Sequence, residues 1–159
     1  MPKCKAPRKK YTPRPVLANP LSYVLTGFKP IRKEDADRIK IISHGSMYAL
    51  TTGTATRADW DFICNALNIA IVLAELGVGD EYTEQIKSAM IAHAQCGKRL
   101  LQGGTLGYTG EQMALVNLAL EIHDAQVDIA TVGEMEYAHI EVEKRRRDKK
   151  LTYVVKEMV

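Results

Sequence analysis

The 159-residue sequence lacks the features that identify a membrane protein or a disulfide-stabilised secreted protein. Acidic side chains bracket its longest apolar stretch, so no run reaches the roughly 18–20 uncharged residues that span a bilayer. The three cysteines, Cys4, Cys64 and Cys96, are far apart and form no C-x-x-C pair, which predicts reduced thiols in a reducing compartment. No apolar segment follows the basic N-terminus, so we expect no secretory signal, no membrane partner and a cytoplasmic protein.

A catalytic signature is also missing. No serine lies in a nucleophile-elbow context, no glycine-rich loop follows a strand, and no zinc-finger, recognition-helix or RNA-binding motif is present. Glu136 and His139 have the Glu-x-x-His spacing of di-metal bundles, but such bundles need a second pair, which this sequence does not contain. We therefore expect no metal, no other cofactor and no enzymatic activity. A helical-bundle metal enzyme, with Glu121 as a further ligand, is the third candidate function.

The longest apolar stretch, residues 56–77, predicts the central helix of an all-α domain. Thr56 is placed to cap this helix, Asp59 stands at its third position, and Gly77 is placed to end it in a left-handed turn. Apolar residues occupy more than one face, so we expect the helix to be buried on most sides.

Caps, apolar spacing and glycines predict the other helices. A short helix covers residues 21–26, and a longer one begins near Glu34 after Pro30. Gly45, inside this longer helix, predicts a break or a close helix crossing. The expected buried face of this helix consists of Ile39, Ile42, Met47 and Leu50.

A fourth helix is expected from Asp80 to the Gly103-Gly104 stop, and two capping boxes, Thr109 to Gln112 and Thr131 to Glu134, start the last two helices. The sequence thus predicts a single compact bundle of about five or six helices over residues 19–143. An extended basic arm, residues 1–18, precedes it, and a basic C-terminal extension, residues 144–159, follows it.

Two polar stripes interrupt the apolar helices and are candidates for a pocket. If they face each other they form a buried hydrogen-bonded seam, and if they face outward they are solvated surfaces. The cost of burying unpaired charge favours the outward arrangement. The first stripe is Asp61, Asn65 and Asn68, and the second is Asn117, Glu121, Asp124 and Asp128, with His123 beside it.

Positive charge is concentrated at the two ends of the chain. Residues 1–15 contain six bases and no acid, and residues 144–150 contain six bases and one acid. Residues 16–143 contain seventeen acids and nine bases, a net charge of −8, although the whole chain has a net charge of +3. Contacts of lysine and arginine with phosphate release counterions, so this segregation predicts a polyanionic partner for the ends. The alternative is that the basic ends maintain solubility or fold back onto the acidic body.

Tyr11 lies within the first basic cluster, where an aromatic ring can stack on a base. The candidate residues for binding nucleic acid or another partner are Lys3, Lys5, Arg8, Lys9, Lys10, Tyr11 and Arg14 in the arm, and Lys144, Arg145, Arg146, Arg147, Lys149 and Lys150 near the C-terminus.

Three segments carry a resemblance to known proteins: Lys10-Tyr-Thr-Pro-Arg-Pro-Val16, Thr54-Ala-Thr-Arg-Ala-Asp59 and Leu118-Ala-Leu-Glu-Ile-His-Asp-Ala-Gln126. Over most of residues 10–140 the chain resembles a family of uncharacterised short proteins from proteobacterial genomes, prophages and plasmids. The family has no established activity, so the resemblance implies no functional residue. It implies a mobile-element context, in which small proteins often bind host nucleic-acid-processing or defence complexes.

Together these observations predict a non-enzymatic binding protein of the phage or mobile-element type. We expect it to attach to nucleic acid or to a nucleoprotein complex through its basic termini, and to inhibit a host defence or nucleic-acid-processing system. The alternative is a protein-only inhibitor or assembly factor whose acidic helical body contacts a host protein, as a nucleic-acid mimic does.

Overall fold

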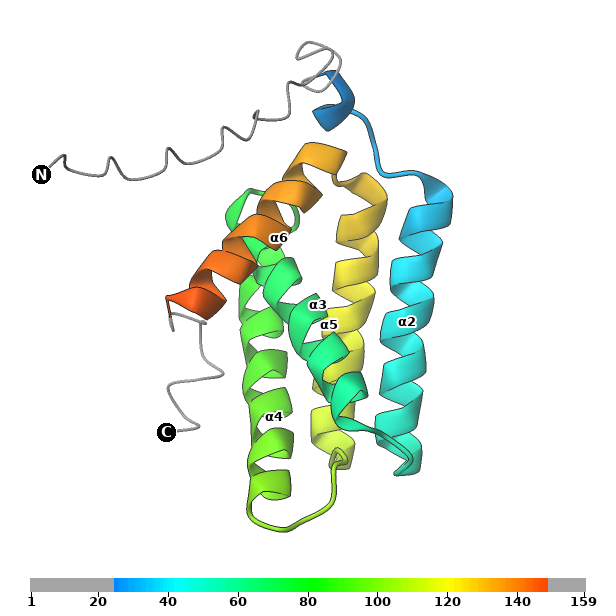
Figure 1. Ribbon diagram of the computed structural model, residues 1–159, viewed down its shortest axis with the longest axis vertical. Helices are drawn as coiled ribbons and strands as arrows, with labels where there is room; N and C mark the ends of the chain where they lie inside the picture. Colours follow the sequence, from blue (N-terminus) through cyan, green and yellow to red (C-terminus); the bar gives the residue numbers. More distant parts are fainter. Residues whose placement is uncertain (1–24, 149–159) are drawn as a thin grey trace, which may run out of the picture.

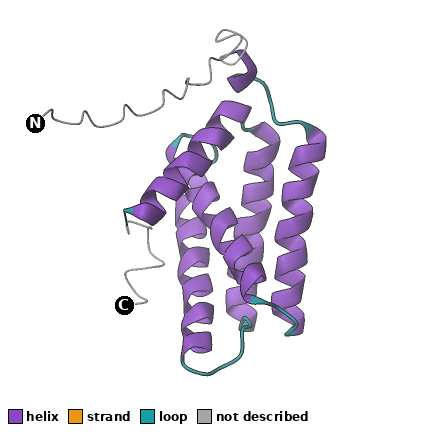
Figure 2. Ribbon diagram, in the orientation of Figure 1, coloured by secondary structure: helices purple, strands orange, loops and turns teal. Residues whose placement is uncertain are grey.

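The computed structural model describes residues 25–148, and every regular element in this range is a helix (Figures 1 and 2). The predicted arm, residues 1–18, and the C-terminal residues 149–159 lie outside the described range. None of the described helices combines the length and the apolar character needed to cross a membrane. The elements are α2 (Lys33–Thr52), α3 (Arg57–Glu75), the 3₁₀ turn η1 (Asp80–Tyr82), α4 (Thr83–Leu101), α5 (Gly110–Ile129) and α6 (Val132–Arg147), preceded by helical residues 25–27.

Helix α3 is the centre of a compact bundle and contacts α2, α4, α5 and α6. In Figure 1, α2, α4 and α5 run along the long axis of the molecule, whereas α3 and α6 run obliquely. Ten residues of α3 are buried, nine of them consecutive, which confirms the predicted burial on most sides. They are Ile63, Ala66, Leu67, Asn68, Ile69, Ala70, Ile71, Val72, Leu73 and Ala74.

The ends of α3 follow the predicted local chemistry. The Thr56 side chain accepts a hydrogen bond from the Asp59 amide at 3.4 Å, and the Asp59 carboxylate accepts one from the Thr56 amide at 2.7 Å. At the other end Gly77 has φ 92°, and the amide of Val78 donates to Leu73 O at 2.9 Å. This six-residue closure needs a left-handed residue, which glycine provides without a Cβ clash.

The other two predicted capping boxes are also present. Thr109 and Gln112 cap α5, and Thr131 and Glu134 cap α6, each with both reciprocal hydrogen bonds. Since each box satisfies two amides that have no partner within the helix, these short sequence patterns determine where α5 and α6 begin.

Helix α2 differs from its prediction in two respects. It is continuous through Gly45, where an added Cβ would meet no atom within 4 Å, so this glycine marks neither a break nor a close crossing. Ile42 is 48% exposed, although Met47 and Leu50 are buried as predicted. The reason is that α2 packs mainly on α3 and α5, and these two helices cover only one side of it.

A small aromatic cluster joins α3 to α4. The Trp60 indole stacks on the His93 imidazole with ring centroids 4.6 Å apart, and its Nε1 donates to His93 O at 3.3 Å. His93 Nε2 donates to Trp60 O at 3.0 Å, and its Nδ1 accepts from the Tyr108 hydroxyl at 2.5 Å. Burial lowers the pKa of His93 to about 4, so the ring is neutral at pH 7 with all its polar atoms paired.

Candidate nucleic-acid interface and adjoining pocket

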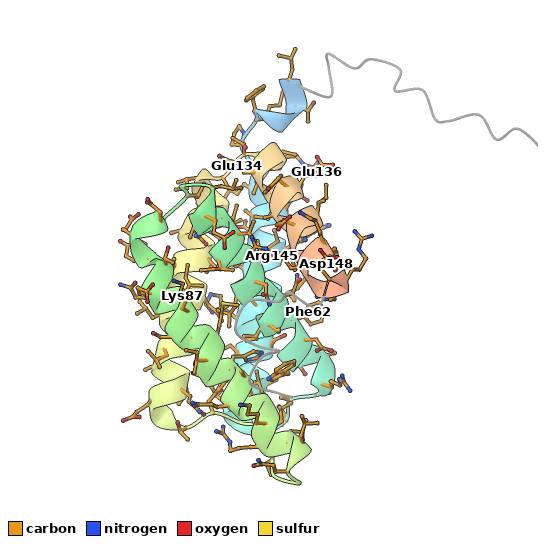
Figure 3. The ribbon with its side chains drawn as sticks, turned by 90° about the vertical axis from the view of Figure 1, so that its left-hand side faces the viewer. Phe62, Lys87, Glu134, Glu136, Arg145 and Asp148 are labelled. Atoms are coloured by element: carbon orange, nitrogen blue, oxygen red, sulfur yellow. The ribbon has the colours of Figure 1, made fainter. Side chains whose placement is uncertain are left out.

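Helix α6 runs out into the predicted basic cluster and extends through Arg147, so the first four cations of that cluster are its last helical residues. In Figure 3, Glu136, Arg145 and Asp148 mark the course of this helix from its first turns to its end. Four basic residues in the last turn face the negative end of the helix dipole, which stabilises them there. The candidates Lys149 and Lys150, like the seven candidates in the N-terminal arm, lie outside the described residues.

Arg145 is turned into the bundle and is only 20% exposed at its side chain. Its Nη1 donates to Glu75 Oε1 and its Nε donates to Glu141 Oε1, each at 3.0 Å. The hydrogen bond to Glu75 raises the pKa of Arg145 above its ordinary value. Arg145 therefore joins the end of α6 to the end of α3, the kind of intramolecular pairing expected if the basic ends fold back onto the acidic body.

The other three cations of this turn face outward. Lys144 Nζ lies 3.2 Å from a Glu141 oxygen, Arg146 Nη1 lies 2.7 Å from a Glu143 oxygen, and both side chains are more than half exposed. Arg147 is exposed, and within residues 25–148 it donates only to the Glu143 carbonyl, at 3.4 Å. Exposed pairs such as Arg146–Glu143 typically contribute ~0.2–0.5 kcal/mol and are screened by salt. These three cations can exchange their partners for phosphate at little cost.

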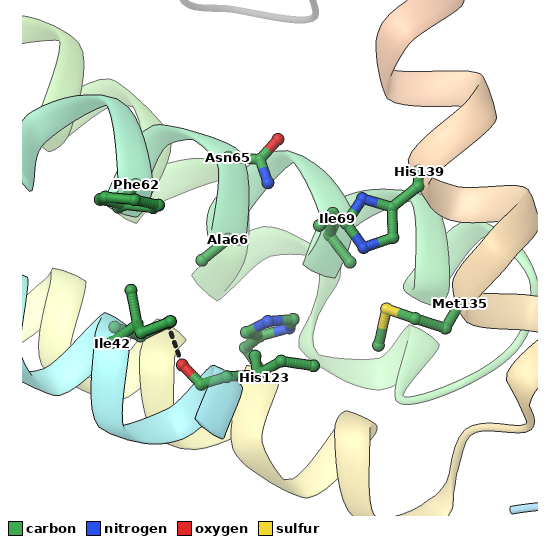
Figure 4. Close-up of a pocket in the computed structure, with 10 residues that line it drawn as sticks. Ile42, Phe62, Asn65, Ala66, Ile69, His123, Met135 and His139 are labelled. Atoms are coloured by element: carbon green, nitrogen blue, oxygen red, sulfur yellow. Dashed lines mark hydrogen bonds between the residues drawn. The ribbon is translucent and has the colours of Figure 1, made fainter. Parts of the chain in front are cut away.

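A small pocket lies where α2, α3, α5 and α6 meet, with a cavity of about 130 Å³. In Figure 4, Phe62, Asn65, Met135 and His139 lie around His123. Among the residues that the structure describes, no Asp, Glu, Lys or Arg side chain lines this cavity. Its walls consist of Ile39, Ile42, Ser43, Phe62, Asn65, Ala66, Ile69, His123, Met135 and His139.

His123 is the buried polar group of this pocket. Only 1% of the residue is exposed, and its Nδ1 has no hydrogen-bond partner among the described residues. Burial lowers the pKa of His123 to about 4, so the imidazole is neutral at pH 7. The Nδ1 atom itself is closed to solvent, and the Gln126 side chain, one turn further along α5, partly offsets the lowering of the pKa as a hydrogen-bonding neighbour.

The two predicted polar stripes do not form a joint seam. On α5, Asp124 Oδ2 lies 2.8 Å from His44 Nε2, and Asp128 Oδ1 accepts from Lys40 Nζ at 2.6 Å, so these acids face α2. On α3, Asp61 is exposed as expected, whereas Asn68 is buried and donates to the Cys64 carbonyl one turn earlier. Asn65, between them, is half-buried and reaches the pocket. The outward arrangement is thus wrong for Asn68 and Asn65.

The Glu136 and His139 pair has no metal-binding environment in the described part of the chain. Within residues 25–148, no three His, Cys, Asp or Glu side chains converge as metal ligands. His139 instead borders the pocket together with His123, and both Glu136 and His139 border an adjoining open groove of about 720 Å³. Periodicity placed His139 and Glu136 near each other, but only the crossing of α6 over α3 brings His139 to Asn65 and His123.

Comparisons of this chain with protein-family models, with curated proteins and with solved structures found no match.

Proposed function

We propose that this protein binds nucleic acid, alone or within a nucleoprotein complex, without catalysing a reaction. The supporting observation is the arrangement of the last turn of α6. Lys144, Arg146 and Arg147 project into solvent with weak partners on their own helix, while Arg145 fastens the helix to the bundle. A helix end that is already fixed to the bundle and presents exchangeable cations is suited to phosphate contacts. Its backbone does not have to be ordered on binding, which reduces the entropic cost of the complex.

The neighbouring sequence extends this positive surface. Lys149 and Lys150 follow the helix directly, and the arm contributes six more cations together with Tyr11. The body between the two ends is acidic, which would repel phosphates and confine the contact to the ends. Because the described contacts are charges without a base-reading motif, the proposed binding is governed by the phosphate backbone and falls steeply with salt.

Filter binding with labelled single-stranded DNA, duplex DNA and RNA tests this proposal over a series of salt concentrations. The test variant replaces Lys144, Arg146 and Arg147 by alanine and retains Arg145. Each lost contact to a single strand reduces the slope of log affinity against log salt by ~0.7, so the triple variant should lose about 2. A matched control removes three other exposed cations, Lys29, Lys33 and Arg38. Equal affinity and slope for both triple variants would contradict the proposal.

A host protein is the second candidate partner, as the sequence analysis also proposed. Two large apolar side chains favour it: Phe28 is 76% exposed, and Ile140, which borders the 720 Å³ groove, is 59% exposed. A contiguous apolar lining such as that of the groove, to which Ile31 and Val132 also belong, is typical of protein contacts. A complex held by such contacts should persist in a pull-down at high salt and after nuclease treatment, whereas binding through phosphates should be lost under both conditions.

A further inference from the structure

The pocket around His123 has the size of a single ring. Its volume of about 130 Å³ is close to the ~150 Å³ of an engineered apolar cavity that binds benzene. Two fused rings would exceed this space. Apolar side chains from three helices, including Ile39, Ile69 and Met135, provide the flat contacts that a planar ring needs on both faces.

The polar groups of the pocket require a ligand with hydrogen-bonding edges. The buried His123 imidazole lies in the lining, and the Asn65 amide offers two donors and one acceptor from the opposite helix. His139 adds a second imidazole from α6 (Figure 4). A ring with hydrogen-bonding edges can pair with these groups, whereas a charged group would find no counter-charge among the described lining residues. The fitting ligand is therefore neutral, planar, one ring in size, and carries both donors and acceptors.

One cation of α6, Arg146, lies on the side of the pocket that His139 borders. His139 and Arg146 are seven residues apart on α6, which places them on the same face, ~10 Å apart along the helix axis. Arg146 also lies near the α3 residue that precedes Asn65. Burial is the largest influence on the Cys64 thiol and raises its pKa to about 11; the charge of Asp61 adds to that increase, and the charge of Arg146 partly offsets it. A ring in the pocket that carries a phosphate would have this guanidinium within its surroundings.

We propose that the pocket binds one pyrimidine base, with the sugar and phosphate directed toward Arg146. The base would be an unstacked nucleotide of a single strand or a free pyrimidine nucleotide, since both present the same ring and phosphate. Phe62, 51% exposed at the pocket, supplies an aromatic face at the entrance. This inference rests on the proposed function and adds to it a preference for one base, which the cations of α6 cannot provide.

The test compares uridine 5′-monophosphate and adenosine 5′-monophosphate by NMR titration of the full chain, and the oligonucleotides rU8 and rA8 by filter binding. We expect uridine monophosphate to shift the imidazole signals of His123 and His139, and we expect adenosine monophosphate to shift them less. Among strands, rU8 should bind more tightly than rA8.

Asn65→Ala is the central variant, because the side chain is half-buried and its removal leaves the floor of the pocket intact. It should weaken binding of uridine monophosphate by at least about fivefold. Asn117→Ala, a half-buried asparagine of α5 outside the pocket, is the matched control and should have no effect. Phe62→Ala, at an exposed site, is a second variant in case Asn65→Ala does not fold.

The outcomes separate this inference from the proposed function. If strands bind and depend on Lys144, Arg146 and Arg147, but rU8 and rA8 bind equally and neither pocket variant matters, the pocket inference is wrong and the proposed function stands. If uridine monophosphate shifts the histidine signals while strands bind independently of the three cations, the pocket inference stands with a free nucleotide as ligand. If neither nucleotide shifts those signals, the pocket inference is refuted.

Discussion

Two helical glycines in opposite surroundings allow the α3–α4 contact to be measured. In α4, a Cβ on Gly97 would lie 2.8 Å from Trp60 Cζ2 and 3.1 Å from Cε2. In α2, a Cβ on Gly45 would meet nothing within 4 Å. Alanine at either position gains helix propensity by up to ~1 kcal/mol, so the difference between the two variants isolates the steric contact.

The Trp60 indole cannot move away from a Cβ at position 97 without losing its contacts with His93. Trp60 is stacked on His93, donates a hydrogen bond to the His93 carbonyl and accepts one at its own carbonyl from His93 Nε2. Gly97→Ala must therefore separate the two helices or tilt the indole out of the stack. Overpacking of this kind costs ~1–3 kcal/mol. Since the propensity gain offsets part of it, Gly97→Ala should destabilise the protein by about 1 kcal/mol, whereas Gly45→Ala should stabilise it by ~0.5–1 kcal/mol.

Urea unfolding followed by circular dichroism measures both free energies of unfolding by linear extrapolation. Thermal melting provides a second measurement, in which 1 kcal/mol corresponds to roughly 2–4 °C for a chain of this size. If Gly97→Ala proves as stable as Gly45→Ala, the tight contact between α4 and Trp60 does not exist, and the packing described for the two helices is incorrect.

Three further predictions concern stability. Because burial lowers the pKa of His93 and of His123 to about 4, against 6.5 when unfolded, the unfolded state takes up their protons first as the pH falls. The free energy of unfolding should be highest above pH 6.5 and decrease by about 2 kcal/mol per histidine between pH 7 and pH 5; a flat profile in urea titrations would show that these rings are not buried and neutral. Arg145→Ala should cost about 1 kcal/mol in chemical unfolding and Arg146→Ala less than ~0.5 kcal/mol, and equal losses would contradict the intramolecular role of Arg145. Thr131→Ala should remove the cap of α6 and lower the free energy of unfolding by ~1 kcal/mol, whereas Thr105→Ala, in the exposed loop, is the control and should have no effect. A Thr131→Ala protein with the same melting temperature as the wild type would argue against the capping box.

The helices could be predicted because their limits depend on short-range chemistry. A threonine followed three residues later by Asp, Gln or Glu forms the same reciprocal bonds in any bundle, as at Thr56, Thr109 and Thr131. Gly77 likewise ends α3 through bonds made within six residues. At each of these helix ends, both partners of the capping or closing hydrogen bonds lie within a few residues of each other in the sequence.

The pocket could not be predicted to the same extent, because its residues meet only through the crossing of helices. Apolar spacing placed Ile42 on the buried face of α2, but spacing does not show how far a neighbouring helix reaches, and Ile42 is half exposed at the pocket. The pairs Asp124 with His44 and Asp128 with Lys40 join residues more than 79 positions apart. Their partners, and the position of His123 in the pocket lining, follow from tertiary geometry alone.

The stack of Trp60 on His93 gives the unmodified protein its own optical reporter. Trp60 is the single indole of the chain, so all tryptophan emission comes from the contact between α3 and α4. An imidazolium quenches an adjacent indole strongly by accepting an excited-state electron, whereas a neutral imidazole does so weakly. The intensity of tryptophan fluorescence therefore reports directly whether the His93 imidazole between these helices is protonated, with no dye attached.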